Sequence, residues 1–174
     1  MKEEEKSLLV RKPDLEKVRH LLSKGVDPNC VSTSRGTRGL TPLINAVNSE
    51  NMDLVKILLE GGADPNIAFN RNTSQASPLC LATWYSNTKI VKLLLHAGAD
   101  PNKANCEGWA PLHWAAFGSG TYNWTEIVEM LLGAGANPDK ADNLHGRTPL
   151  DLARRDGKYG MVKQLLVARA EDSG

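Results

Sequence analysis

Histidine and cysteine are the residues of this sequence best suited to metal binding or nucleophilic catalysis, but their spacing supports neither. The seven side chains are scattered along the chain as His20, His96, His113, His145, Cys30, Cys80 and Cys106. No histidine stands at metal-ligand spacing from a cysteine, a carboxylate or another histidine, and there is no CxxC pair. The sequence also lacks a phosphate-binding glycine loop and a nucleophile elbow. We therefore expect no catalytic residue, no metal site and no cofactor, and we predict that the chain is not an enzyme.

Two adjacent aromatic residues carry a different kind of chemistry. Trp84 and Tyr85 lie side by side in the segment LATWYSNTKIV, which has the pattern of one helix ending and another beginning. Neighbouring residues on a helix cannot both face one core. At least one ring must therefore point elsewhere, and exposed Trp and Tyr side chains are typical of protein-binding surfaces.

The elements that position these residues recur along the chain. Eight of the nine prolines fall in two contexts, one like TPL and one like ADPN. The prolines of the first context are Pro42, Pro78, Pro111 and Pro149, which are spaced by 36, 33 and 38 residues. The glycines ahead of the second context are Gly25, Gly62, Gly98 and Gly135, which are spaced by 37, 36 and 37 residues. This period indicates an array of structural repeats of about 33 residues with small insertions.

Each repeat has the local signals of two short helices. Thr41 is suited to the N-cap of the first helix, and Pro42 to its first turn, where no backbone N–H is needed. The segment LINAV then forms the first helix, SENM ends it, and DLVKILLEGG forms a more apolar second helix that ends at Gly62. Asp64, Pro65 and Asn66 predict a turn, followed by an extended finger. Two such helices cannot bury their apolar faces alone, so the repeats must stack.

With these motifs in place, the sequence resembles the ankyrin repeat family. The helix start xPL, the second-helix pattern xIVKxLLxxGADPN and their spacing match the family four times, and a degenerate copy, DLEKVRHLLSKGVDPN, precedes them. The resemblance implies an all-α ankyrin-repeat solenoid of about five stacked helix–turn–helix repeats with β-hairpin-like fingers. We expect a single domain, 1–174, with repeats at approximately 4–36 (the N-terminal cap), 37–72, 73–105, 106–143 and 144–174 (the C-terminal cap).

The chain departs from the family pattern at several positions. Ala110 replaces the capping Thr or Ser, which should weaken that helix start by roughly 1 kcal/mol. Gln75 replaces the finger glycine that is present as Gly39, Gly108 and Gly146. The first two complete fingers are lengthened, and the fourth repeat has extra residues between its helices in FGSGTYNWTE. Insertions in a solenoid map to loops, often on the binding face.

The resemblance also implies where a partner would bind. In the family, the residues that close each first helix and the residue ahead of each xPL motif face a concave groove; the latter here are Leu40, Ala76, Trp109 and Arg147. The predicted partner-binding residues are Trp84, Tyr85, Trp109, Phe117, Tyr122, Trp124, Arg38, Arg71 and Arg147. Trp114, Phe69 and Tyr159 are expected to pack within the fold. An alternative is that Phe117 and Trp124 fold under the inserted loop as a small satellite core.

His113 and Cys80 occupy matching places in successive repeats. The family implies that His113 hydrogen-bonds the neighbouring finger, while Cys80 is expected to be a small core residue. The resemblance further makes the asparagines of the DPN turns (Asn29, Asn66 and Asn102) candidate sites of asparaginyl hydroxylation.

Composition narrows the function. The net charge of +1 argues against nucleic-acid binding, and no apolar run approaches a membrane span. The absence of a signal peptide and the three unpaired cysteines predict a reducing compartment, the cytoplasm or the nucleus. The leading hypothesis is a monomeric, non-catalytic protein–protein interaction module that binds a peptide or protein partner, with an apolar or aromatic anchor and an acidic flank, in the concave groove. The alternatives are an inhibitory or targeting subunit that occludes an enzyme, a recruitment arm of a longer multidomain protein, and a small-molecule site under the inserted loop.

Overall fold

The computed structural model describes residues 14–32, 39–68, 75–118 and 124–172. Within these ranges the secondary structure is entirely helical. The helices are α2 (Leu15–Ser23), α3 (Pro42–Asn48), α4 (Met52–Glu60), α5 (Pro78–Trp84), α6 (Thr88–His96), α7 (Pro111–Phe117), α8 (Trp124–Gly133), α9 (Pro149–Arg155) and α10 (Tyr159–Asp172). The predicted all-α fold is therefore confirmed.

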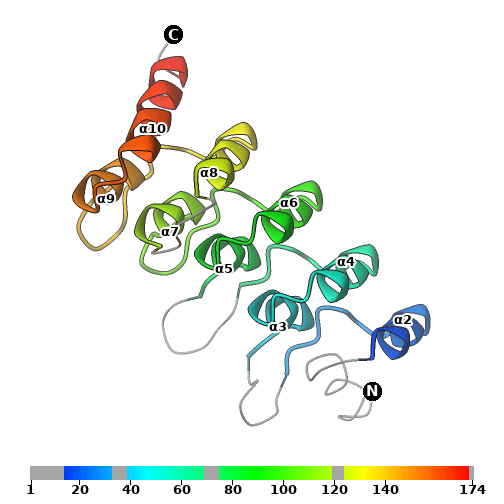
Figure 1. Ribbon diagram of the computed structural model, residues 1–174. Helices are drawn as coiled ribbons and strands as arrows, with labels where there is room; N and C mark the ends of the chain where they lie inside the picture. The colour runs from blue at the N-terminus through cyan, green and yellow to red at the C-terminus, as the bar shows by residue number, and fades with distance from the viewer. Residues whose placement is uncertain (1–13, 33–38, 69–74, 119–123, 173–174) are drawn as a thin grey trace.

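The helices are arranged in two parallel rows (Figure 1). The short first helices α3, α5, α7 and α9 form one row, and the second helices α2, α4, α6, α8 and α10 form the other. Among the described helices, the two helices of a repeat contact each other, and equivalent helices of successive repeats are also in contact. The first helix expected for the N-terminal cap falls at residues 4–12, outside the described residues.

Side-chain caps start the first helices as the sequence indicates. The hydroxyl oxygens of Thr41, Ser77 and Thr148 accept the backbone N–H three residues later. Ala110 has no such oxygen, so α7 begins without a side-chain cap on this N–H. Instead, the backbone N–H of Ala110 donates to Nδ1 of His113 at 3.2 Å. This bond is the other half of a capping box, and it ties the helix start to the buried histidine.

The asparagines of the DPN turns join successive repeats. Oδ1 of Asn29, Asn66 and Asn102 accepts the backbone N–H of Asp64, Asp100 and Asn137, respectively, at 2.8, 2.8 and 2.7 Å. Nδ2 of Asn66 and Asn102 also donates to the carbonyls of Gly98 and Gly135 in the next repeat. The turns therefore form a ladder of hydrogen bonds along the array. This ladder explains why each turn carries an amide side chain, which can both accept and donate.

The buried core runs continuously between the two rows of helices. Leu43, Leu79, Leu112 and Leu150 of the first helices are no more than 2% exposed, and they pack with Leu58, Leu94 and Leu131 of the second helices. This arrangement shows why a single repeat could not fold alone, because each leucine needs the neighbouring repeat to cover it.

Some positions differ from what the sequence indicates. The expectation that Tyr159 packs within the fold is wrong, because its side chain is 84% exposed at the start of α10. Leu40 and Ala76 were expected to face the groove, but both are buried. Phe69 lies outside the described residues.

Candidate partner-binding surface

Four aromatic side chains from two adjacent repeats converge at one place, here called the aromatic cluster: Trp84, Trp109, Trp114 and Phe117. Trp84 is the last residue of α5, and Phe117 is the last residue of α7. Trp109 lies just ahead of α7, and Trp114 lies within it. Because α5 and α7 pack against each other, the ends of the two helices bring these rings together.

Phe117 contacts two of the other rings of the cluster. Its ring stacks on Trp84 with centroids 5.9 Å apart and meets Trp109 edge-on at 5.0 Å. Trp114 is T-shaped to both Trp84 and Trp109, at 5.6 Å in each case. These offset and edge-to-face arrangements are the ones that aromatic pairs prefer. The cluster is therefore one packed unit rather than four separate rings.

The cluster is only partly covered by the fold. Phe117 and Tyr85 are each 41% exposed, and Trp84, Trp109 and Trp114 are partly buried. Tyr85 adjoins Trp84 as the C-cap of α5, and its hydroxyl donates to Oδ1 of Asn48 in the preceding repeat at 3.4 Å. The adjacent residues Trp84 and Tyr85 thus have different surroundings. Trp84 joins the rings of the next repeat, whereas Tyr85 turns toward the previous one.

The ring of Phe117 also contacts a cationic side chain of the fifth repeat, Arg155. Cζ of Arg155 lies 5.7 Å from the centroid of the Phe117 ring, within the range of a cation–π contact. Asp156 holds the same guanidinium through Nε at 2.7 Å and Nη2 at 3.2 Å. The hydrogen bond from Arg155 lowers the pKa of Asp156 below its ordinary value, against the opposing effect of desolvation. The sequence already places Arg155 at a groove-facing position, as one of the residues that close the first helices. It was not among the predicted partner-binding residues, because its contact with Phe117 crosses a repeat boundary.

Lys158 closes the carboxyl end of α7. Its Nζ donates to the carbonyl oxygens of Ala115 and Gly118. The equivalent residues of the earlier repeats, Asn51 and Asn87, instead cap the second helix of their own repeat. Burial lowers the pKa of Lys158, although Asp156 opposes this shift. The fifth repeat therefore replaces the hydrogen bonds that α7 would otherwise lack where the insertion begins.

Arg147 was predicted to bind a partner, but its guanidinium makes an ion pair and a hydrogen bond within its own finger. Its Nε lies 3.1 Å from Oδ2 of the buried Asp142, and Nη2 lies 2.8 Å from Nδ1 of His145. Desolvation would raise the pKa of Asp142, but hydrogen bonds from the His145 N–H and from Arg147 outweigh it and lower the pKa. The backbone carbonyl of Arg147 also contacts Nε2 of His113 at 3.2 Å. This network gives Arg147 a structural role in the fifth finger.

His113 and Cys80 have the surroundings that were predicted for them, a hydrogen bond to the neighbouring finger and a place in the core, respectively. His113 is fully buried and reaches the next finger through Arg147, and burial lowers its pKa. Cys80 is also fully buried, and its Sγ lies 4.0 Å from the carbonyl of Trp109, the residue that corresponds to Arg147. Burial raises the pKa of the Cys80 thiol to about 11, so the group is a neutral core residue and not a thiolate nucleophile.

Trp124, another predicted binding residue, makes none of the ring contacts of the cluster within the described residues. Trp124 begins α8 and packs over Gly160 of α10, where an added Cβ would lie 2.9 Å from its ring. Trp124 thus packs on the last helix, and Phe117 is exposed within the cluster. The alternative placed both under the inserted loop, whose residues 119–123 lie outside the described residues. Trp114, expected only to pack, contributes to the cluster as well. Arg38, Arg71 and Tyr122 lie outside the described residues.

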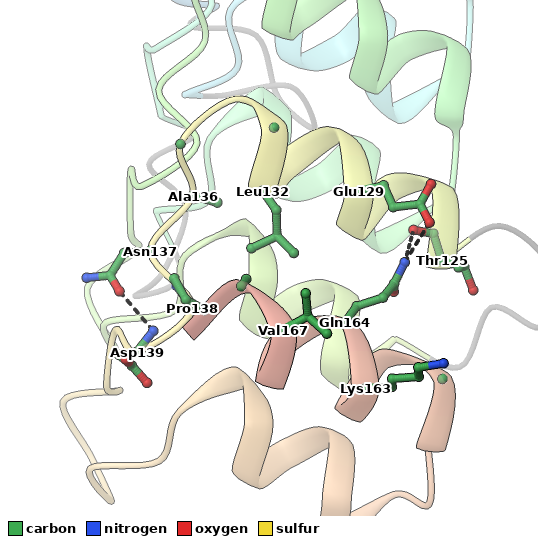
Figure 2. Close-up of a pocket in the computed structure, with 14 residues that line it drawn as sticks. Thr125, Glu129, Leu132, Ala136, Asn137, Pro138, Asp139, Lys163, Gln164 and Val167 are labelled. Carbon is green, nitrogen blue, oxygen red and sulfur yellow. Dashed lines mark hydrogen bonds between the residues drawn. The ribbon is translucent and has the colours of Figure 1, made fainter. Parts of the chain in front are cut away.

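A cleft of about 1070 Å³ lies on the other row of helices, between α8 and α10 (Figure 2). Glu129 and Thr125 of α8 line one side, and Gln164 of α10 bridges to both of them. Leu132 and Val167 supply apolar area. The charged residues that line the cleft are Glu129, Asp139 and Lys163, and they do not form a converging set of catalytic side chains.

The described residues contain no group of three or more His, Cys, Asp or Glu side chains that could hold a metal ion. No helix in the same ranges has the length and apolarity needed to cross a membrane.

Comparison with known proteins agrees with this architecture. The family model for ankyrin repeats (3 copies) matches residues 7–105 and 98–173. The chain therefore belongs to the ankyrin repeat family, whose repeats generally mediate protein–protein interactions and are typically non-catalytic. One similar protein is the 2-5A-dependent ribonuclease of Mus musculus, which is 44% identical over 66 residues. That similarity covers 37% of this chain and 9% of the ribonuclease, so it does not extend to the ribonuclease as a whole.

Proposed function

We propose that the chain is a non-catalytic binding module and that the aromatic cluster, with Tyr85 beside it, is the centre of its partner-binding surface. The observation that carries this proposal is the exposure of Phe117 and Tyr85 in a region where three tryptophans also gather. An isolated exposed apolar residue is ordinary, but a group of large aromatics on the surface is typical of an interaction site. Trp and Tyr supply contact area with few rotamers to restrict on binding.

The form of the cluster supports a protein or peptide partner. Its rings are fixed against one another by stacked and edge-to-face contacts, so the surface is organised before a partner arrives. Such preorganisation lowers the entropic cost of association. The indole N–H groups of Trp109 and Trp114 are buried and have no hydrogen-bond partner within the described ranges. Because they are buried, they do not present a donor at the surface, and polar contacts with a partner would come from the residues around the cluster.

The proposal also covers the kind of partner, the cellular compartment and the extent of the binding surface. We assign the partner an apolar or aromatic anchor, and we place the chain in the cytoplasm or nucleus as a monomer. Arg38, Arg71 and Tyr122, all in inserted or lengthened loops of the sequence, are proposed to extend the surface. An occluding subunit would use the same surface against a folded enzyme. A recruitment arm of a larger protein is also consistent with the small share of the ribonuclease that the similarity covers.

The test compares the two faces of the molecule. Partners would be captured on the immobilised chain, purified, and titrated by calorimetry against Trp84→Ala, Trp109→Ala, Lys56→Ala and Lys92→Ala. Both lysines are exposed on the second row of helices. The tryptophan variants should each cost more than about 2 kcal/mol of binding, whereas the lysine variants should cost little. Equal losses from both faces would show that the aromatic cluster is not the site.

A further inference from the structure

The last residue of α9, Arg155, and Lys158 in the turn that follows lie against the carboxyl end of α7, at the edge of the aromatic cluster. We propose that Arg155 is the acid-reading group of this surface, so that the surface binds a linear protein segment with a carboxylate side chain close to an aromatic one. This inference rests on the proposed function, because Phe117 is the link between Arg155 and the cluster.

The geometry of the guanidinium supports this role. Asp156 occupies the edge formed by Nε and Nη2, at 2.7 and 3.2 Å. A guanidinium carries five N–H donors in a planar fork, so the edge formed by Nη1 and Nη2 can still receive a second carboxylate. The side chain is 47% exposed. Phe117 below and Asp156 beside it hold the plane of the fork, which reduces the rotamer freedom that binding would otherwise remove.

The other nearby cations do not offer this arrangement. Arg147 is held by the buried carboxylate of Asp142 and by His145. Lys158 uses its ammonium group on the carbonyls of Ala115 and Gly118. Its bonds also fix the end of the helix that carries Phe117, and so they help to hold the ring on which Arg155 rests.

The local charge favours a carboxylate over a more highly charged anion. Asp156 is adjacent to the proposed contact, so a dianionic phosphate would meet repulsion as well as attraction. The net charge of +1 gives no long-range attraction for a polyanion. Arg155 lies 5.7 Å from the Phe117 centroid, and an extended chain advances about 3.3 Å per residue. The carboxylate should therefore lie about one to three residues from the aromatic anchor.

The experiment uses a phage-displayed library of random short linear peptides. Selections would be run in parallel on the full chain and on its Arg155→Gln, Arg154→Gln and Trp109→Ala variants. Arg154 is the matched control, because it is an exposed arginine on the same helix. The wild type and Arg154→Gln should enrich peptides with an aromatic residue and a nearby Asp or Glu. Arg155→Gln should keep the aromatic preference and lose the acidic one, and Trp109→Ala should lose the aromatic preference.

Synthetic peptides from the wild-type selection then give the magnitude. A selected peptide should bind Arg155→Gln about fivefold more weakly than the wild type, a modest effect because the arginine is exposed. The amide analogue of the same peptide, with Asp or Glu changed to Asn or Gln, should bind both proteins equally. Asp156→Asn is a second variant, because it leaves Arg155 in place and should retain the acidic preference.

The outcomes separate this inference from the proposed function. Aromatic enrichment without an acidic preference, or an acidic preference that survives Arg155→Gln, would overturn the role of Arg155 and leave the aromatic surface standing. An equal loss of acidic peptides in Arg154→Gln would show that general surface charge is responsible, which also overturns it. The absence of aromatic enrichment on the wild type would overturn both the inference and the aromatic surface.

Discussion

The ring of Trp84 stacks on the ring of Phe117 across the boundary between the third and fourth repeats, with an interplanar angle of 21°. Trp84 closes α5 and Phe117 closes α7, so the equivalent ends of two first helices are joined by a direct aromatic contact. The same two residues therefore contribute to the interface between repeats and to the exposed surface. Mutations in the cluster should affect stability as well as binding, and the two effects must be measured separately.

Truncation of the cluster should destabilise the protein moderately. Phe117→Ala removes the contacts with Trp84 and Trp109 but vacates a site that is 41% exposed. We expect a loss of about 1–2 kcal/mol in the free energy of unfolding, below the 3–5 kcal/mol typical of a fully buried Phe. Urea denaturation would measure it. Tyr159→Ala is the control, because an 84% exposed side chain should contribute less than about 0.5 kcal/mol. Equal effects of the two substitutions would contradict this assignment.

Restoring the missing cap of α7 should stabilise the array. Thr41 and Thr148 accept the N–H of the third helical residue, but Ala110 cannot. Ala110→Thr should raise the free energy of unfolding by about 0.5–2 kcal/mol. Its hydroxyl would add a side-chain acceptor for the His113 N–H, which now donates to the Ala110 carbonyl at 2.9 Å. The midpoint of a denaturant titration provides the measurement. A lower midpoint would mean that the buried Ala110 site has no room for the larger side chain.

Substitutions at the two equivalent finger positions, Gln75 and Gly108, should change the stability in opposite directions. Gln75 adopts φ +29° at the position where Gly108 has φ +84°, so the glutamine is in a region that favours glycine. Gln75→Gly should therefore stabilise the protein by up to about 1 kcal/mol. Gly108→Ala should destabilise it, both because of its positive φ and because a Cβ there would lie 2.7 Å from the backbone nitrogen of Asn143. Thermal unfolding of the two variants beside the wild type would test the pair. A stabilised Gly108→Ala variant would show that the fourth finger can move away.

The local signals of the sequence predicted most of the fold but only part of the site. Proline and glycine positions define the helices, because a cap or a left-handed turn depends on a few adjacent residues. The cluster was harder to predict, since Trp114 and Phe117 are three residues apart on one helix but meet Trp84 only through stacking of the repeats. Lys158 was not predicted, and Arg155 was placed at a groove-facing position but not predicted as a binding residue, because both act on the preceding repeat. Leu40 and Ala76 showed the reverse error, since a shared repeat position does not guarantee a shared exposure.

The buried His113 should make the free energy of unfolding depend on pH. The Ala110 N–H donates to Nδ1, so the neutral ring carries its proton on Nε2 and donates it to the carbonyl of Arg147. Protonation of Nδ1 would remove the acceptor for Ala110 and place a charge in the core. Burial accordingly lowers the pKa of His113, against smaller opposing contributions from the Arg147 carbonyl and from Asp142.

The sign of the effect follows from the direction of this shift. Below the ordinary histidine pKa the unfolded chain binds a proton that the folded chain does not, so the free energy of unfolding should decrease as the pH falls from about 7 toward 5. Denaturant titrations across this range would measure the decrease. His113→Cys, which copies the residue that repeat three carries at the same place, should reduce the decrease because its thiol does not take up a proton in this range. His20→Gln, on the surface of α2, should retain the wild-type decrease. If His113→Cys and His20→Gln gave the same pH dependence as the wild type, the buried imidazole would not be the group responsible.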